Sequence, residues 1–355
     1  MINIQTLVPD NAIVHRQSFA QQYVDYSTKF SGIDAVNYST EPGKILAVWY
    51  TELASHEHIS WHPVNIIFAK TVQQIYDFRH RLDPDCSYIF VTESWCDLDS
   101  MREFFEPTIL DHCCVLNEVM DYGREWFQFD SHLAVIETDC TVTPSYDFFC
   151  LIGRRSWLRS MMISELLSLD LSHSLVKYHG TVLTACDAAN FDSFNYDQHN
   201  FYSDYHRVPT GLTRLSKLVQ ASLYHNFRFE VQVETDPYGD HMGWDLHEFH
   251  VTEKSLRPLI MNKPCLMLGP RGYHGWLAQH GIDLGQRNFD WTAFDSIADE
   301  RDRMIAMIKV LADVDFSSVK PSHEEYVNNL AGLHSLANLS KASARRFDRL
   351  IRDHG

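Results

Sequence analysis

The sequence has no run of about 18 apolar residues, the length that an α-helix needs to cross a bilayer. Its first residues also lack the basic stretch followed by an apolar stretch that marks a secretory signal peptide. These absences predict a cytoplasmic protein without membrane contact.

Short catalytic signatures are missing as well. The eight cysteines include no CxxC pair, and a zinc ribbon or a thioredoxin-type redox site needs that spacing. Cys150 and Cys265 stand inside apolar runs, which is typical of reduced cysteines in the core of a cytosolic protein. The patterns GxSxG and HExxH and the phosphate-binding P-loop do not occur.

Positive charge is scarce. The chain has 30 Lys and Arg against 47 Asp and Glu, and its formal net charge is -17. Proteins that bind nucleic acid gain affinity by neutralising phosphates with Lys and Arg. This balance argues against general nucleic-acid binding, although a locally basic groove inside an acidic protein would still permit it.

What is present is a long chain with a large apolar fraction. The chain has 355 residues, of which 45% are hydrophobic and 13% are aromatic. This length is too great for one hydrophobic core of usual size, so we expect two packed domains. Strand-like runs alternate with helical spacing, which predicts parallel βαβ units and an α/β fold. We expect domains over 1–143 and 144–322, followed by a helical segment, 323–355, that packs back towards the first domain.

The patterns place individual elements along both halves. Strands are expected over 44–53, 87–95, 132–140, 146–153, 227–235 and 265–269. Helices are expected over 71–82, 100–119, 156–170, 211–227, 252–260, 273–281, 301–314 and 324–351, with Gly281 just after the end of the helix over 273–281.

Two arginines, Arg154 and Arg155, stand between the expected strand over 146–153 and the helix after it. A helix start carries partial positive charge and free N–H groups. Arginine adds fixed charge and fork-shaped donors, so this junction could hold a diphosphate. A solvated or ion-paired surface pair is the alternative.

A second cluster lies at the start of the expected helix over 252–260, where Thr252 is a plausible N-cap. Glu253 could accept both hydroxyls of a ribose, as an acidic residue does in dinucleotide-binding folds. Lys254 and Arg257 are three residues apart and share one helix face, where they could balance a diphosphate. An ordinary capped helix with surface charges is the alternative.

Residues 146–167 and 251–284 resemble two segments of a phage and bacterial glycosyltransferase family. The block VTEKSLRPLIMNKPCLMLGP is similar to that family's TEK segment, which is also similar to the donor-binding motif of α1,3-fucosyltransferases. FEVQVETDP resembles the family's strand ending in TET. The resemblance covers about 146–310 of this chain and none of the first 140 residues by any motif. Gly153 and Ser156 depart from the Asn and Pro of the family pattern.

The resemblance implies a GT-B architecture, in which two Rossmann-like domains face a cleft. It also implies a location in the cytoplasm of a bacterium or of a phage-infected host. It implies a sugar-nucleotide donor bound by the second domain and a hydroxyl acceptor bound by the first. Glu253 would bind the donor ribose, and Lys254 with Arg154 or Arg155 would bind the diphosphate. Glu234 would end a strand facing the cleft and, like Thr252, would belong to the residues that bind the donor. No cofactor is implied beyond the donor, and no metal is required where Arg and Lys supply the charge.

Sugar transfer needs a general base to deprotonate the acceptor hydroxyl. Glu93, which ends the strand over 87–95, is the first candidate. Glu52, His56 and His58 are the next candidates, and an ordinary loop residue is the alternative for each.

Metal sites have weaker support. The DPD and DLD patterns at 83–85 and 97–99 match the Asp-x-Asp pattern by which some glycosyltransferases bind manganese, but such short patterns arise by chance. His241, His247 and His250 fit the spacing of no closed site, so we interpret them as part of a polar loop.

Three functions stay open. The first is transfer of a sugar to a glycan, a small molecule or a hydroxymethylated base of phage DNA, of which the DNA acceptor fits the acidic charge least. The second is a nucleotide-sugar epimerase or hydrolase on the same scaffold. The third is a non-catalytic protein that binds a nucleotide or a glycan.

Overall fold

The computed structural model describes residues 2–7, 36–39, 45–49, 53, 58–69, 71–92, 105, 113–117, 144–153, 156–179, 181–184, 226–234, 249, 251, 253–336 and 349. The chain forms two compact units. Unit 1 comprises Met1–Asp121, Trp244–Phe249 and Leu336–Gly355, and unit 2 comprises Tyr122–Gly243 and His250–Ser335. The units alternate along the chain, whereas the expected domains are consecutive ranges, and those domain limits stay a prediction.

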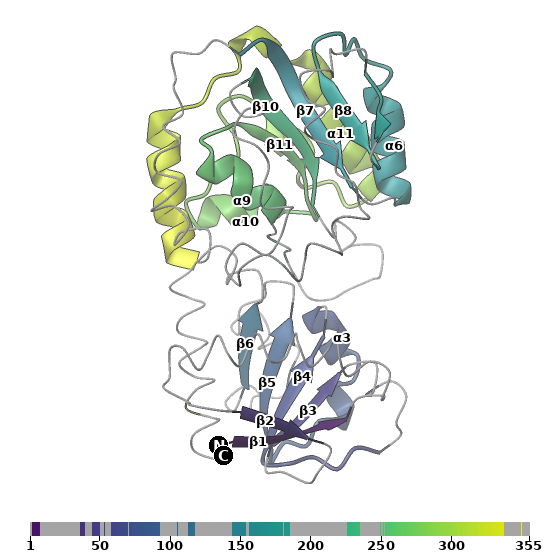
Figure 1. Ribbon diagram of the computed structural model, residues 1–355, viewed down its shortest axis with the longest axis vertical. Coiled ribbons are helices and arrows are strands. Elements are labelled where there is room, and N and C mark those ends of the chain that lie inside the picture. Colours follow the sequence, from purple (N-terminus) through teal and green to yellow (C-terminus); the bar gives the residue numbers. More distant parts are fainter. Residues whose placement is uncertain are drawn as a thin grey trace. The chain divides into compact units, whose positions relative to one another are not determined.

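Unit 1 contains a six-stranded parallel sheet with the spatial order β2-β1-β3-β4-β5-β6 (Figure 1). The strands span Ile2–Leu7 (β1), Val36–Ser39 (β2), Ile45–Trp49 (β3), Val64–Phe68 (β4), Ser87–Thr92 (β5) and Cys113–Asn117 (β6). Every residue of β4 and β5 is buried, because inner strands of a parallel sheet are covered on both faces.

A short helix, α3 (Val72–Tyr76), covers part of this sheet. It begins with a capping box, in which Thr71 and Gln74 each accept a hydrogen bond from the backbone N–H of the other. Its apolar side packs with Phe105 in the core of unit 1. The expected helix over 71–82 is therefore shorter than predicted, and the 3-10 turn η1 (Arg79–Arg81) follows it.

The expected helix over 100–119 is wrong at its C-terminal end, where β6 pairs in parallel with β5. The run CCVLN is short and mostly apolar, and such runs are common to buried strands and helices. Pairing with β5 satisfies the backbone groups on the side of this run that faces β5, which favours the strand. The expected strand over 132–140 lies outside the described residues, and the expected helix over 211–227 lies almost wholly outside them.

Unit 2 contains a five-stranded sheet with the order β11-β10-β7-β8-β9. The strands span Tyr146–Ile152 (β7), Leu175–Tyr178 (β8), Thr181–Val182 (β9), Phe227–Val233 (β10) and Cys265–Leu268 (β11). All neighbours are parallel except β8 and β9, which form an antiparallel pair at one edge.

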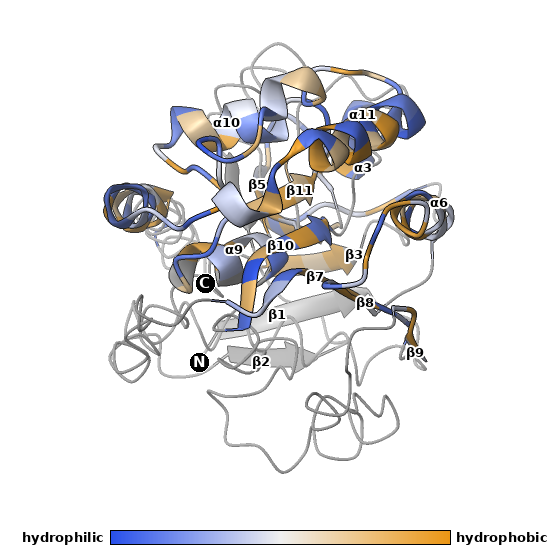
Figure 2. Ribbon diagram, turned by 90° about the horizontal axis from the view of Figure 1, so that it is seen from above, coloured by the Kyte–Doolittle hydropathy of each residue, from blue (hydrophilic) through white to orange (hydrophobic). Residues whose placement is uncertain are grey.

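The helices of unit 2 follow its strands along the chain. They are α6 (Trp157–Leu166), α9 (Glu253–Ile260), α10 (Tyr273–Gln279), α11 (Glu300–Asp313) and a helix over 323–336, with 3-10 turns η5 (Trp291–Ala293) and η6 (Phe316–Ser318). Figure 2 shows that α11 has an apolar and a polar side, and the apolar side packs with α6 into the core.

Side chains of β10 alternate between two environments. Phe229, Val231 and Val233 belong to the apolar core formed with α6 and α11. Glu230, Gln232 and Glu234 alternate with them and therefore point to the opposite face of the sheet, where they are also buried. One face of this strand is thus apolar, while the other carries a row of polar groups.

These two sheets dominated by parallel strands confirm the predicted α/β class and are consistent with two Rossmann-like bodies. The expected strands over 146–153, 227–235 and 265–269 and the expected helices over 156–170, 252–260, 273–281 and 301–314 are confirmed with small changes at their ends. Gly281 follows the end of α10 with a φ of 75°, as predicted. Among the helices that the structure describes, none is long and apolar enough to span a bilayer.

Candidate functional site

The strand order of unit 2 reverses direction between β7 and β10. The chain leaves β7 through α6 and returns in β8 on one side, whereas it leaves β10 through α9 and returns in β11 on the other side. In open α/β sheets, ligands bind outside the carboxyl ends of two strands whose connections diverge in this way. The carboxyl ends of β7 and β10 therefore mark the candidate site, which we call the carboxyl edge.

Arg159, in the first turn of α6, lies at the carboxyl edge. Its Nη2 atom donates to the backbone carbonyl of Glu234, directly after β10, at 3.3 Å. The turn begins with Ser156, whose hydroxyl accepts from the N–H of Arg159 at 3.3 Å. Arg159 as a residue is only 9% exposed, so the fold places a largely buried arginine where the two strands diverge.

Glu234 connects three helices at this edge. Its carbonyl accepts from Arg159 of α6, and its Oε1 atom accepts from the Ser255 hydroxyl of α9 at 2.8 Å. The Tyr273 hydroxyl of α10 lies 3.5 Å from the same Oε1 and 2.6 Å from the Ser255 oxygen. The side chain of Glu234 is fully buried.

Tyr273 reaches this cluster because Gly269 has no side chain. A Cβ atom at Gly269 would lie 2.4 Å from the Tyr273 ring, so the ring occupies the space that any larger residue would fill. Burial, with the charge of Glu234 as a smaller contribution, raises the pKa of the Tyr273 phenol well above its usual value. The hydroxyl is therefore protonated at any physiological pH.

The start of α10 already has a negative partner. The carboxylate of Asp295 accepts from the backbone N–H groups of His274 and Gly275, each at 3.0 Å. This contact neutralises the partial positive charge of a helix start. Of the helices that begin at the carboxyl edge, α6 and α9 are the ones whose starts could attract an anionic ligand.

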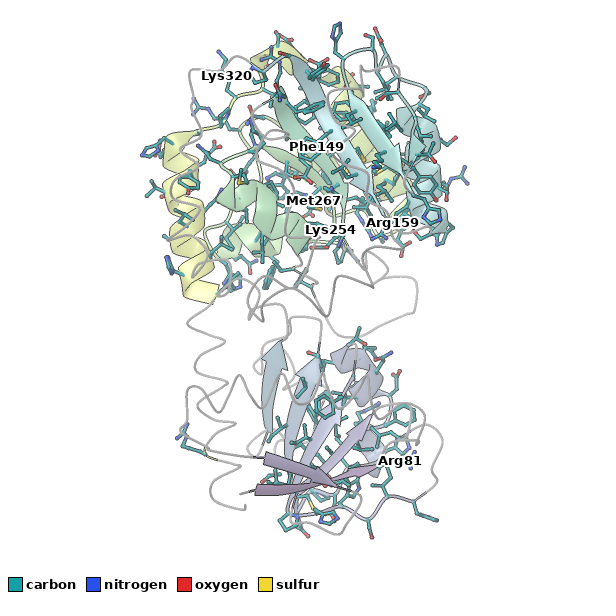
Figure 3. The ribbon with its side chains drawn as sticks, in the orientation of Figure 1. Arg81, Phe149, Arg159, Lys254, Met267 and Lys320 are labelled. Carbon is teal, nitrogen blue, oxygen red and sulfur yellow. The ribbon has the colours of Figure 1, made fainter. Side chains whose placement is uncertain are left out.

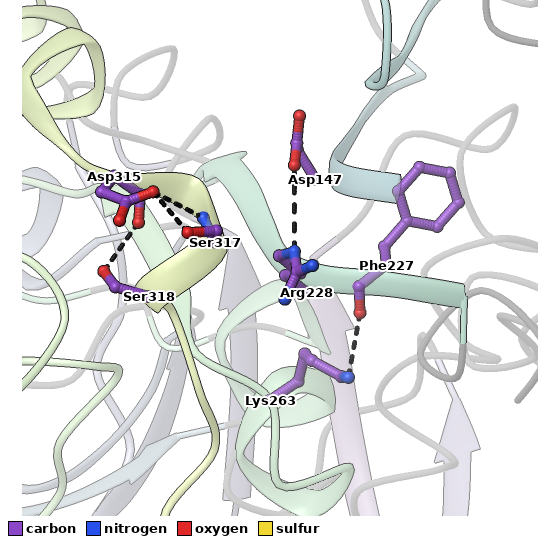
Figure 4. Close-up of polar contacts among 7 residues, drawn as sticks. All are labelled: Asp147, Phe227, Arg228, Lys263, Asp315, Ser317 and Ser318. Atoms are coloured by element: carbon purple, nitrogen blue, oxygen red, sulfur yellow. Dashed lines mark hydrogen bonds and ion pairs between the residues drawn. The ribbon is translucent and has the colours of Figure 1, made fainter. Parts of the chain in front are cut away.

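Side chains at the opposite edge of the sheet, where the strands begin, pair with one another (Figure 4). Arg228 lies 3.9 Å from Asp147, and Lys263 donates to the carbonyl of Phe227 at 2.9 Å. Burial raises the pKa of the Asp147 carboxyl, and nearby His173 and Arg228 oppose that rise. These contacts stabilise the ends of β7 and β10, so this edge offers a weaker candidate.

Among the predicted site residues, the structure describes the side chains of Glu234 and Lys254 and, among the further candidate bases, that of His58, which is exposed ahead of β4. Lys254 is partly exposed on the first turn of α9, next to Ser255. Figure 3 shows Lys254 and Arg159 on the elements that meet at the carboxyl edge. Glu253 and Arg257 belong to α9, but their side chains are outside the described part. Arg154, Arg155, Thr252 and Glu93 are also outside it.

Sequence reasoning missed Arg159, Ser255 and Tyr273. A signal existed for Arg159, because it shares the 3, 4 and 7 spacing of Met162, Ile163 and Leu166, which face the core. That spacing indicated a buried arginine on an apolar helix face. No local signal indicated Ser255 or Tyr273, because their contacts with Glu234 join residues 21 and 39 positions apart.

No additional metal ligands accompany the sequence patterns for metal binding in the described part of the chain. Within the described residues, no group of three His, Cys, Asp or Glu side chains could hold a metal ion. In the DPD pattern, the Asp83 carboxylate accepts from the backbone N–H of Asp85 at 3.0 Å, as in a turn. The DLD pattern and the three histidines, His241, His247 and His250, lie beyond the part of the chain that is described.

The carboxyl edge combines two helix starts, a buried arginine, a partly exposed lysine and a buried carboxyl that joins three helices. The resemblance to glycosyltransferases stays a prediction from the sequence. Comparison with family models, with curated proteins and with solved structures gave no match to this chain.

Proposed function

We propose that the chain is a glycosyltransferase that binds a nucleotide-diphosphate sugar at the carboxyl edge of unit 2 and transfers the sugar to a hydroxyl acceptor. The observation that carries the proposal is the divergence of the chain between β7 and β10, with Arg159 and the starts of α6 and α9 around it. Diphosphates bind at such points because helix starts and arginine forks favour phosphate oxygens. A GT-B arrangement of the two units around a cleft is part of this proposal.

The proposed donor contacts follow the order of the chain. Arg154 and Arg155, directly after β7, bind the diphosphate with Lys254 of α9. Thr252 caps α9, Glu253 accepts the ribose hydroxyls, and Arg257 adds charge one turn later. In this proposal Arg159 is a further cation beside the diphosphate. These cations stabilise the nucleoside diphosphate as it leaves, which is the charge that develops in the transition state.

The acceptor base is proposed to come from unit 1. Glu93 follows β5 directly, and it stays the first candidate. The connections of unit 1 diverge between β1 and β3, and Glu52 follows the last residue of β3 by three positions. The same rule for open α/β sheets therefore favours the segment of Glu52, His56 and His58 as the second candidate.

A nucleotide screen tests the donor site. Purified protein would be titrated with UDP-, GDP-, ADP- and CMP-sugars while its thermal unfolding is followed. A ligand at about 100 times its Kd should add about 2.7 kcal/mol to the free energy of unfolding. Alanine at Arg154, Glu253 or Lys254 should remove that shift. A wild-type protein that is stabilised by none of these nucleotides would overturn the proposal.

Turnover separates transfer from the other functions. Product analysis with the stabilising donor and glycan, small-molecule or hydroxymethylated-DNA acceptors should show a glycosylated acceptor. Donor breakdown or epimerisation without any acceptor indicates the epimerase or hydrolase instead, and binding without turnover indicates a binding protein. Glu93→Gln and Glu52→Gln should each be compared for loss of turnover with unchanged donor affinity, because a base acts on the acceptor and not on donor binding.

A further inference from the structure

We infer that Glu234 is a positioning residue of the donor site, which holds the first turn of α9 in place through Ser255 and does not contact the donor itself. This inference rests on the proposed function, because it assigns a role to a residue at the edge where the donor is proposed to bind. It replaces the direct donor contact that the sequence resemblance implies for Glu234 with an indirect one.

Burial separates Glu234 from any ligand. The side chain has no exposed surface, and its Oε1 atom is contacted by two hydroxyl groups from within the protein. A buried carboxylate would also repel the negative diphosphate, whereas hydroxyl donors can stabilise that carboxylate inside the fold. The geometry therefore suits an internal anchor better than a ligand for phosphate or sugar.

The hydrogen bonds have one consistent direction. Ser255 donates its single hydroxyl hydrogen to Glu234 over 2.8 Å. The Ser255 oxygen can then only accept from Tyr273, whose hydroxyl lies 2.6 Å away and stays protonated. The chain of donors thus runs from Tyr273 through Ser255 to Glu234, with each hydroxyl held in one orientation.

This series of hydrogen bonds determines the positions of the residues that are proposed to bind the sugar donor. Ser255 follows Lys254 directly and Glu253 by two residues in the same helical turn. A helical turn moves as a rigid piece, so a shift of Ser255 shifts both neighbours relative to β10. The backbone carbonyl of Glu234 meanwhile accepts from Arg159. One residue therefore links the first turn of α9 to that of α6, on either side of the proposed diphosphate.

The test uses the full chain and a set of conservative variants. Ser255→Ala removes the hydroxyl that joins α9 to Glu234 and leaves Glu234, Lys254 and Glu253 unchanged. Ser255→Thr keeps a hydroxyl, and Glu234→Gln keeps an acceptor oxygen at the same position. Ser317→Ala is the matched control, because Ser317 bonds only locally to Asp315 at the opposite edge (Figure 4). Each protein would be titrated calorimetrically with UDP, GDP, ADP and CMP, followed by steady-state kinetics with the sugar form of the nucleotide that binds.

Ser255→Ala should weaken nucleotide binding roughly tenfold, since a hydrogen bond to a charged group is worth more than a neutral one. The KM for the donor should rise with it, while kcat changes less. Ser255→Thr and Glu234→Gln should retain at least part of the affinity, and Ser317→Ala should match the wild type. A role in folding alone would lower Tm in Ser255→Ala without changing the Kd of the folded protein.

Two results overturn the inference by different routes. If the wild type binds a nucleotide and Ser255→Ala binds it equally well, Glu234 does not act through Ser255 and the inference fails alone. If Glu234→Gln loses binding while Ser255→Ala keeps it, Glu234 contacts the donor directly. A wild type that binds none of the four nucleotides removes the proposed function and this inference together.

Discussion

The side-chain amide of Asn329 pairs with both backbone polar groups of Asp283. Its Oδ1 atom accepts from the Asp283 N–H at 2.6 Å, and its Nδ2 atom donates to the Asp283 carbonyl at 2.7 Å. Asn329 lies in the helix over 323–336, and Asp283 follows α10. This pair fastens that helix to the segment between α10 and η5, and the side-chain amide supplies the two bonds from separate acceptor and donor atoms.

Asn329→Leu should therefore destabilise unit 2. The substitution keeps a similar volume but leaves the backbone N–H and carbonyl of the half-buried Asp283 without this partner, which costs about 1–3 kcal/mol in all. Urea unfolding followed by circular dichroism would measure the loss. Asn288→Leu is the matched control, because the Asn288 side chain also pairs with a backbone, that of Lys320, but in an exposed place. Equal losses for the two variants would contradict the interpretation.

Gly332→Ala should also be destabilising. A Cβ atom there would lie 2.6 Å from the carbonyl oxygen of His280 and 2.7 Å from a side-chain atom of Ile282. The oxygen belongs to the backbone and cannot rotate away, so the helix over 323–336 would have to move, at a cost of about 1–3 kcal/mol.

Gly275→Ala provides the contrast for the glycine prediction. Its Cβ atom would lie 3.5 Å from Asp295, an ordinary contact, and the residue stands inside α10. Alanine stabilises helix interiors by about 1 kcal/mol relative to glycine. Thermal unfolding should therefore shift down for Gly332→Ala and upward or not at all for Gly275→Ala, and shifts of the same sign would contradict the packing that places the last helix.

His274 should make stability depend on pH. Burial lowers the pKa of its imidazole below 6.5, and the charge of Asp295 opposes this shift in part. Below pH 6.5 the unfolded chain takes up a proton that the folded imidazole resists, so the free energy of unfolding falls as pH falls towards the folded pKa. The slope is at most about 1.4 kcal/mol per pH unit for one group.

The measurement compares the wild type with His274→Gln between pH 7.5 and 5 by urea unfolding. The variant keeps a polar side chain that can reach the Met267 carbonyl, which lies 2.8 Å from Nε2 in the wild type. The wild type should lose more stability than the variant below pH 6.5, while the two differ by a constant amount above it. Parallel curves over the whole range would show that His274 titrates alike in both states.

Arg159→Lys should weaken nucleotide binding at the proposed site. Arg159→Lys keeps the positive charge but loses the planar fork that can bind two oxygens at once. We expect roughly tenfold weaker nucleotide binding for Arg159→Lys, on the scale of one charge-assisted hydrogen bond. Calorimetric titration would measure it, with Arg301→Lys as the exposed control on α11. Unchanged affinity in both variants would remove Arg159 from the proposed site.

The type and place of the strands were predicted best where the local sequence pattern agrees with the observed fold. β7, β10 and β11 are apolar runs flanked by helical spacing, so their type and place could be read directly. The sequences of β1 and β8 are shorter or more polar, so their strand conformation depends on pairing with neighbouring strands. The run CCVLN was predicted to be helical, but it forms β6 because its conformation also depends on pairing with a neighbouring strand.

The candidate site could be predicted only in part. The place of Lys254 on the first turn of α9 was predicted, because charge at a helix start is visible along the chain. Asp295 was not, because it reaches the N–H groups of His274 and Gly275 from about 20 positions away. Such contacts form only after the strands have paired and their ends lie close together, so no local sequence pattern predicts them.

The carboxylate that Asp295 places at the start of α10 has a consequence for crystallography. Sulfate and phosphate from a precipitant collect where backbone N–H groups are open and avoid places that already carry a negative charge. In crystals grown from such salts, anion density should gather before α6 or α9, and the first turn of α10 should stay free of it. The positions of these ions would outline where the phosphates of the proposed nucleotide donor bind, before any nucleotide is soaked in.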